Sequence, residues 1–174
     1  MGFGQDAHVY VEKMRAELHE LELQGVILAG NAFSPVLVVK GEQGPAETSG
    51  GALLSGADGK ALRAALTKLG YAPEEWCALA CWRQDGGFLT PALARLAIAT
   101  LSPSTLIAAD EVAAALISDP YVGEPPRLDL GRVSMVAGMR VLRLGGFEAA
   151  LGDMRSKQRM WARLKLIPPL VEPY

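Results

Sequence analysis

Cysteine and histidine are the side chains of this sequence that most often bind transition metals. Cys77 and Cys81 lie four residues apart in WCALACWR, a segment with the composition of a strand, and residues four apart on a strand point to the same face. The two histidines, His8 and His19, lie far upstream, so the cysteines have no nearby partner for ligating a metal. We therefore interpret them as buried, reduced thiols and expect no bound metal or other cofactor.

A carboxylate and an amide follow a segment that has the composition of a buried strand. The run PVLVVKGE (35–42) is β-branched and ends in Gly-Glu, and Gln43 comes next. Ligands of α/β proteins bind at the carboxyl ends of strands, so Glu42 is a candidate for activating water or binding a ligand. Gln43 is a candidate for reading the edge of a base. The alternative, in which Glu42 is an exposed loop acid, stays open, and Gly41 and Gly44 either let backbone amides approach an anion or only form turns.

Charge is unevenly distributed along the chain, whose net charge is −2. Residues 1–126 carry 8 Lys and Arg against 15 Asp and Glu, a net of −7, whereas residues 127–165 carry 9 against 3, a net of +6. A basic end of this kind is able to contact phosphate. Arg155 and Arg159 share one stripe of a predicted helix, and Arg143 ends an extended segment. These three are the candidate nucleic-acid contacts, and a merely solvated basic surface is the alternative.

The candidate residues must be positioned by alternating strands and helices. Apolar periodicity and cap residues predict helices over 6–24, 58–69, 90–101, 111–118 and from 153 onward, and strands over 35–42, 76–82 and 104–109. Residues 132–136 and 139–144, on either side of Ala137-Gly138, are expected to form a hairpin or two extended pieces. Asp58, Thr90 and Asp110 are the predicted N-caps of three of these helices. In the helix after Thr90, the residues expected to face inward are Leu93, Leu96, Ala97 and Leu101.

This alternation predicts an α/β protein with a three-layer α/β/α sandwich and a four-stranded, mostly parallel sheet. We expect a single domain over 1–174, with an N-terminal helix in residues 1–25 and a tail over 168–174. A site is expected at the carboxyl ends of the strands, in the loops after residues 40, 82, 109 and 144.

The sequence favours a cytoplasmic protein without membrane contact. No apolar run reaches the roughly 20 residues that a membrane-spanning helix needs. The N-terminus, MGFGQDAHVYVEK, has no basic region followed by an apolar stretch, as a secretory signal would.

Three segments in order resemble the family 4 uracil-DNA glycosylases, and together they cover about residues 30–167. VVKGEQGPAETSGGALLSGADGKAL is similar to the family's first motif, in which a strand, Gly-Glu and a turn lead into a helix. LTPALARLAIATLSPSTLIAADEVAAALI resembles its helix, Pro-containing turn, third strand and next helix. GRVSMVAGMRVLRLGGFEAALGDMRSKQRMWARLKLI looks like the stretch with its His-Pro motif and closing helix. The resemblance implies the uracil-DNA glycosylase fold and a role in DNA repair.

The resemblance also implies positions for the family's functional residues. Glu42 matches the carboxylate of its Gly-Glu motif. Its base-stacking Phe falls on Leu54, its base-reading Asn on or near Ala78, and its His on Gly146 or the neighbouring Gly145. These replacements have no side chain able to stack, read uracil or stabilise the leaving anion. The family's iron–sulfur cluster needs four cysteines, and this sequence has two, so we expect no cluster.

The leading interpretation is therefore a uracil-DNA glycosylase-like protein with a degenerate active site. Base excision is expected to be lost or much weakened, and a weak, non-specific binding of DNA or a nucleotide-related ligand is expected to remain. One alternative is an active DNA glycosylase, an N-glycosidic hydrolase that uses Glu42. The other is a non-catalytic interaction module that reuses the fold.

Overall fold

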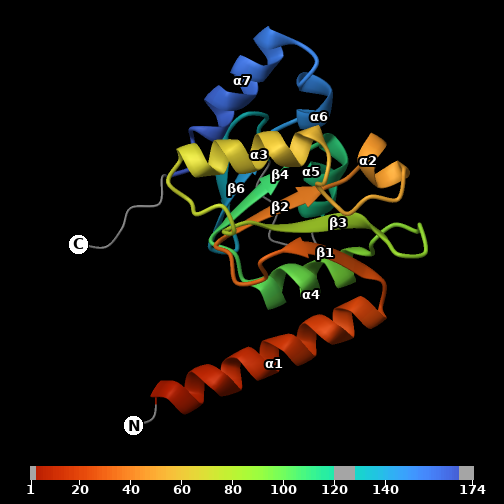
Figure 1. Cartoon of the computed structure of the whole chain (residues 1–174), viewed down its shortest axis with the longest axis vertical. Helices are drawn as coiled ribbons and strands as arrows, with labels where there is room; N and C mark the ends of the chain where they lie inside the picture. Colours follow the sequence, from red (N-terminus) through yellow and green to blue (C-terminus); the bar gives the residue numbers. More distant parts are fainter. Residues whose placement is uncertain (1–2, 120–127, 169–174) are drawn as a thin grey trace.

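Six strands form one mixed sheet at the centre of the molecule, in a computed structural model that describes residues 3–119 and 128–168 (Figure 1). In order across the sheet these are β1 (Val26–Gly30), β3 (Cys77–Arg83), β2 (Val36–Lys40), β4 (Thr105–Ala108), β6 (Met139–Arg143) and β5 (Val133–Val136). The central four, β3, β2, β4 and β6, are parallel, and β1 and β5 pair antiparallel at the two edges. The α/β class is confirmed, but the predicted strand number of four is wrong.

The difference lies at the two edges of the sheet. Val26–Gly30 directly follows the first helix and is only five residues long, and it was not predicted as a strand. The two extended pieces near the C-terminal end form the hairpin of β5 and β6, which turns at Ala137 and Gly138, both at positive φ. The parallel centre is the part that was predicted, because its strands are buried on both faces and therefore read as continuous apolar runs.

Helices cover both faces of the sheet. The described helices are α1 (Phe3–Leu23), α2 (Pro45–Thr48), α3 (Ala57–Lys68), α4 (Pro91–Leu101), α5 (Glu111–Ile117), α6 (Phe147–Ala150) and α7 (Met154–Leu164). Buried side chains of α1, α4 and α5 form one apolar cluster with the sheet, and those of α3, α6 and α7 form a second cluster on the opposite face (Figure 1). Strand β2 separates the clusters, since Leu37 and Val39 belong to the first and Val36 and Val38 to the second.

Local cap residues fix where several helices begin. Thr90 accepts a hydrogen bond from the N–H of Leu93, and Asp110 caps α5 in the same way, as predicted. The inward face of α4 differs from its prediction at Leu96, which is 50% exposed, because α4 packs through Ala94 and Ile98 as well as its predicted alanine and leucine. None of the helices within 3–119 and 128–168 is long and apolar enough to cross a membrane.

Two predicted regions fall mainly beyond the described ranges. The sequence predicts an irregular surface loop from Asp119-Pro120 through Pro125-Pro126, of which only Asp119 is described, and the tail expected over 168–174 is described only at its first residue.

Candidate functional site

A pocket of about 300 Å³ lies at the carboxyl ends of the parallel strands, where a site was expected. The segments after β2, β4 and β6 line it, and the loop after β3 contributes no lining residue. Its lining residues are Lys40, Glu42, Gln43, Gly44, Pro45, Asp58, Ala109, Asp110, Gly146, Phe147, Glu148 and Ala149. Four of these side chains are carboxylates and one is a lysine, so the pocket is acidic.

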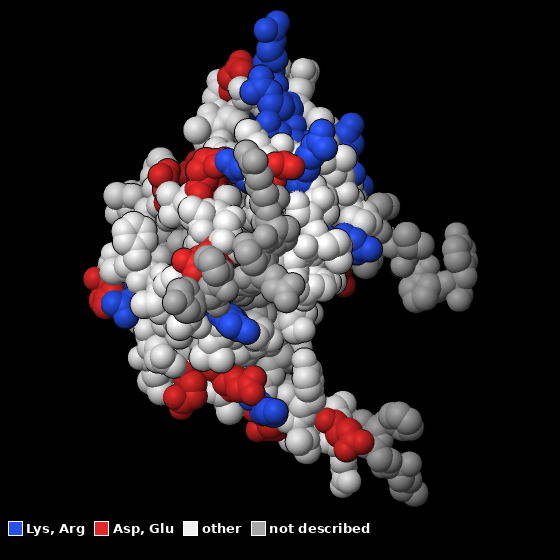
Figure 2. All heavy atoms as spheres, turned by 180° about the vertical axis from the view of Figure 1, so that it is seen from behind, with Lys and Arg blue, Asp and Glu red and all other residues white. Residues whose placement is uncertain are grey.

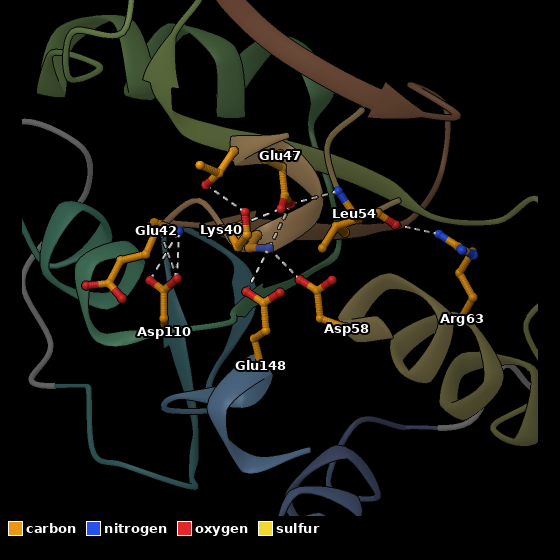
Figure 3. A network of polar contacts seen from close by, with 11 residues as sticks. Lys40, Glu42, Glu47, Leu54, Asp58, Arg63, Asp110 and Glu148 are labelled. Carbon is orange, nitrogen blue, oxygen red and sulfur yellow. Dashed lines mark hydrogen bonds and ion pairs between the residues drawn. The ribbon is translucent and has the colours of Figure 1, made fainter. Parts of the chain in front are cut away.

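Lys40 is the central cation of this region (Figure 3). It is the last residue of β2, and its side chain is only 3% exposed. Its Nζ lies 2.7 Å from Oε1 of Glu47, 2.6 Å from Oδ2 of Asp58 and 3.1 Å from Oε2 of Glu148. One ammonium thus joins β2 to α2, α3 and α6.

These three carboxylates determine the protonation state of Lys40. Burial alone would lower the pKa of its ammonium, but the hydrogen bonds to Asp58, Glu47 and Glu148 outweigh burial and raise the pKa above its ordinary value of 10.5. A lysine acts as a nucleophile only when it is neutral. Lys40 therefore holds the three segments together and is unsuited to forming a Schiff base.

Glu47 orders the loop between β2 and α3. Its side chain is 4% exposed, and besides binding Lys40 it accepts hydrogen bonds from the N–H of Gly44 at 3.1 Å and of Leu54 at 3.2 Å. Burial alone would raise the pKa of Glu47, but the hydrogen bonds from Lys40 and from backbone N–H groups lower it. Glu47 is therefore an ionised carboxylate that binds both ends of the loop.

Asp58 is not the N-cap of α3, in contrast to the prediction from the sequence. The N-cap of α3 is Gly56, and Asp58 lies within the first turn, where its carboxylate turns inward to Lys40. Its Oδ1 is buried and, among the described residues, has no hydrogen-bond partner. An Asp followed by Gly before an apolar helix has the local pattern of an N-cap. Here, however, the carboxylate accepts a hydrogen bond from the buried ammonium of Lys40, 18 residues earlier.

Asp110 closes the pocket on the side of α5. As the N-cap of α5 it accepts from the N–H of Ala113, and it also accepts from the N–H groups of Gly41 at 2.9 Å and Glu42 at 3.0 Å. Gly41 is required there, because a Cβ on it would lie 2.3 Å from Oδ1 of Asp110. The backbone amides of Gly41, Glu42 and Gly44 are thus already bonded to carboxylates.

Glu42 and Gln43 are the predicted site residues that remain available at the pocket. Both are exposed and line it. Within the described part of the chain, the carboxylate of Glu42 makes no hydrogen bond or ion pair, in contrast to the carboxylates of Asp58, Asp110 and Glu148. Figure 3 shows it beside Asp110, away from the ammonium of Lys40. This carboxylate is free to bind a water molecule or a ligand N–H.

Only one of the three positions that match the resembling family's remaining functional residues lines the pocket. Leu54 is 2% exposed, with a φ of 58°, and packs in the core with α3. Ala78, the second residue of β3, is fully buried beside Val38. Neither lines the pocket, whereas Gly146 does. A Cβ on Gly146 would meet nothing within 4 Å, so the pocket is open at this point.

The predicted nucleic-acid contacts separate into two groups. Arg143 forms an ion pair with Glu111 and donates to the carbonyl oxygen of Leu128 at 2.9 Å, so its guanidinium is already used within the fold. Arg155 and Arg159 are exposed on α7. Figure 2 shows Lys and Arg gathered at the end of the molecule where α7 lies. Since α6, which lines the pocket, leads directly into α7, this basic helix is adjacent to the acidic pocket.

The cysteines have the environment that was predicted. Cys77 and Cys81 are free thiols on β3, 2% and 1% exposed, in the same apolar cluster. Burial raises the pKa of Cys77 to about 11 and that of Cys81 to about 12, so both stay protonated near neutral pH. Across 3–119 and 128–168, no group of three or more His, Cys, Asp and Glu side chains is placed to hold a metal ion.

Sequence reasoning missed the cluster of Lys40, Glu47, Asp58 and Glu148. One signal for it exists, namely a lysine at the end of a β-branched run that reads as a buried strand, because a buried ammonium requires carboxylate partners. The partners themselves come from three later segments and are not identifiable from spacing.

No protein-family model matches the sequence, and no curated protein matches it.

Proposed function

We propose that this chain is a uracil-DNA glycosylase-like protein of the three-layer α/β/α type, and that it binds nucleic acid without excising a base. The observation that carries the proposal is the pocket itself. It has an unpaired carboxylate at Glu42 and an amide at Gln43, but an open position at Gly146, where the resembling family has the His that stabilises its leaving group.

Loss of excision follows from the charge of the pocket. Excision produces a uracil anion, which a working site must stabilise with donors or cations. Here the lining carboxylates are Glu42, Asp58, Asp110 and Glu148, and the only cation among the described lining residues, Lys40, is fully engaged by carboxylates. A developing anion would be repelled rather than stabilised. The carboxylate that would assist water is present without the group that would receive the negative charge.

Binding of an uncharged base is compatible with the same charges. Carboxylates accept hydrogen bonds from base N–H groups, and an amide both donates and accepts. Glu42 and Gln43 would therefore contact the edge of an extruded base, while its phosphates would remain outside the acidic pocket. Arg155 and Arg159, exposed on the adjacent helix α7, have the sign needed to bind those phosphates.

Fluorescence anisotropy with two matched single-stranded probes tests this proposal. One probe has a single uracil, and the other has a stable abasic analogue at that position. We expect both to bind at low salt through their phosphates, and the uracil probe to bind more tightly. In Glu42→Ala/Gln43→Ala this preference should disappear while general binding stays.

Arg155→Ala/Arg159→Ala should weaken the binding of both probes. Its matched control is Arg15→Ala/Arg95→Ala, which removes two exposed arginines on α1 and α4, on the opposite face of the sheet. No binding at low salt would contradict the proposal and favour a non-catalytic interaction module. Equal affinity for both probes in the unmodified protein would exclude the base pocket.

A further inference from the structure

A second hollow, of about 370 Å³, lies between α3 and α7 and shares only Phe147 with the described lining of the acidic pocket. Helix α6 contacts both of these helices and forms one end of the hollow. On α3 the lining residues are mostly alanines, including Ala61 and Ala64, and on α6 and α7 they include Phe147, Met160 and Trp161. Small side chains on one wall and large ones on the other leave an apolar groove between two helices.

The charged residues that line this groove are lysines. Lys68 comes from the last turn of α3, and Lys157 comes from α7, one helical turn before Trp161. The ammonium of Lys68 lies 5.6 Å from the ring centroid of Trp161, and that of Lys165 lies 5.7 Å from it. Within residues 3–119 and 128–168, no Asp or Glu lines the groove. Its charge is thus opposite to that of the pocket at the sheet edge, although the whole chain has a net charge of −2.

We propose that this groove binds an acidic amphipathic helix of a partner protein. Such a helix would insert apolar side chains spaced at i, i+3, i+4 and i+7 against the alanines and Trp161, and its carboxylates would face Lys68 and Lys157. The lysines suit the carboxylates of such a helix by charge, and the apolar lining favours this occupant over nucleic acid, because alanine and leucine side chains have no groups that hydrogen-bond to base edges. This interaction is separate from the proposed nucleic-acid binding and does not depend on it.

The test uses a synthetic fluorescein-labelled peptide of about 14 residues, four helical turns, with Leu at the i, i+3, i+4 and i+7 positions and Glu on the remaining surface. A matched peptide has Lys in place of each Glu. We expect saturable binding of the acidic peptide in anisotropy titrations and no binding of the basic one. The chain has three tryptophans, and each gives its own indole N–H signal in a ¹⁵N-correlated NMR spectrum. The Trp161 signal should shift on addition of unlabelled acidic peptide, while those of Trp76 and Trp82 stay in place.

Two groove variants and one control variant locate the binding. Lys68→Glu/Lys157→Glu should weaken it by at least about tenfold, because like charges then face each other. Ala64→Trp should also weaken it by filling the groove from an exposed position. Lys13→Glu/Arg15→Glu makes the same charge change on the exposed surface of α1 and should leave binding unchanged. Circular dichroism and thermal melting verify that each variant is folded.

Several outcomes would overturn the proposal. These are no binding of the acidic peptide at low salt, equal binding of the basic peptide, an unmoved Trp161 signal, and equal affinity in the groove and control variants. A single-stranded oligothymidine that displaces the acidic peptide, and whose own binding is lost in Ala64→Trp, would assign the groove to nucleic acid instead.

Discussion

Nζ of Lys40 and Oδ2 of Asp58 lie 2.6 Å apart, although 18 residues separate them, and this contact fixes the first turn of α3 against the end of β2. Both side chains are 3% exposed. The pocket at the sheet edge is built around this pair, since both residues line it. Glu148 of α6, which also pairs with Lys40, lines it too.

Removal of the Lys40 ammonium should destabilise the fold strongly. We expect Lys40→Met to lower the free energy of unfolding by about 3–5 kcal/mol, because it leaves buried carboxylates without their cation. Urea denaturation measures the change. Lys60→Met, which alters an exposed lysine of α3, serves as the control and should lie within about 0.5 kcal/mol of the unmodified protein. A loss of less than about 1 kcal/mol for Lys40→Met would show that the cluster contributes little to stability.

Stability should depend on pH at the acid end through Glu47. Its pKa is lowered by folding, so its contribution is present above the ordinary value of 4.5 and is lost as the pH falls through the lower folded value. The pKa of Lys40 is raised, so its contribution is present below 10.5 and is lost only above that pH. We expect urea midpoints to be level from 4.5 up to about 9, the ordinary pKa of a thiol, and to fall below 4.5. Above 9 they should fall as well, because burial raises the pKa values of Cys77 and Cys81 in the folded state. Glu47→Gln, although less stable at neutral pH, should lose less on acidification, and a curve parallel to that of the unmodified protein would contradict this.

A methyl group added at Gly41 should be poorly tolerated. Its Cβ would lie 2.3 Å from Oδ1 of Asp110 and 2.6 Å from the backbone nitrogen of Ala113, so the end of β2 and the start of α5 would have to separate. We expect Gly41→Ala to cost about 1–3 kcal/mol in thermal or urea denaturation. Gly152→Ala, in the exposed segment between α6 and α7, is the matched control, because the nearest atom to its added Cβ is 4.0 Å away. Equal stability of the two variants would mean that the β2–α5 contact is looser than described.

The salt dependence of nucleic-acid binding should report the contacts of α7. Each phosphate contact on a single strand contributes roughly 0.7 to the slope of log affinity against log salt. Arg155→Ala/Arg159→Ala should therefore reduce the magnitude of that slope by roughly 1.4, whereas Arg15→Ala/Arg95→Ala should leave it unchanged. An unchanged slope in the α7 variant would place the phosphate contacts elsewhere.

Much of the fold could be predicted from the sequence, because its signals are local. The continuous apolar runs of the central strands, the Thr90 and Asp110 caps and the buried cysteines each depend on neighbouring residues. The errors have tertiary causes. Asp58 has the local context of a cap but pairs with Lys40, and Leu96 fits an apolar helical pattern but lies on the exposed face of α4. Glu42, Gln43 and Gly146, which were candidates from the sequence, line the pocket at the sheet edge, whereas its ion cluster unites four separate segments and therefore leaves no local pattern.

Base excision, scored together with binding, tests the central claim most directly. The protein is held in excess over a labelled single-stranded oligonucleotide with one uracil, and abasic-site formation and anisotropy are measured on the same sample. Because the described lining residues of the pocket are four carboxylates against one lysine that carboxylates already bind, we expect saturated binding with abasic sites no more frequent than without protein. Abasic sites that accumulate with the unmodified protein and disappear with Glu42→Ala would contradict this and identify an active glycosylase.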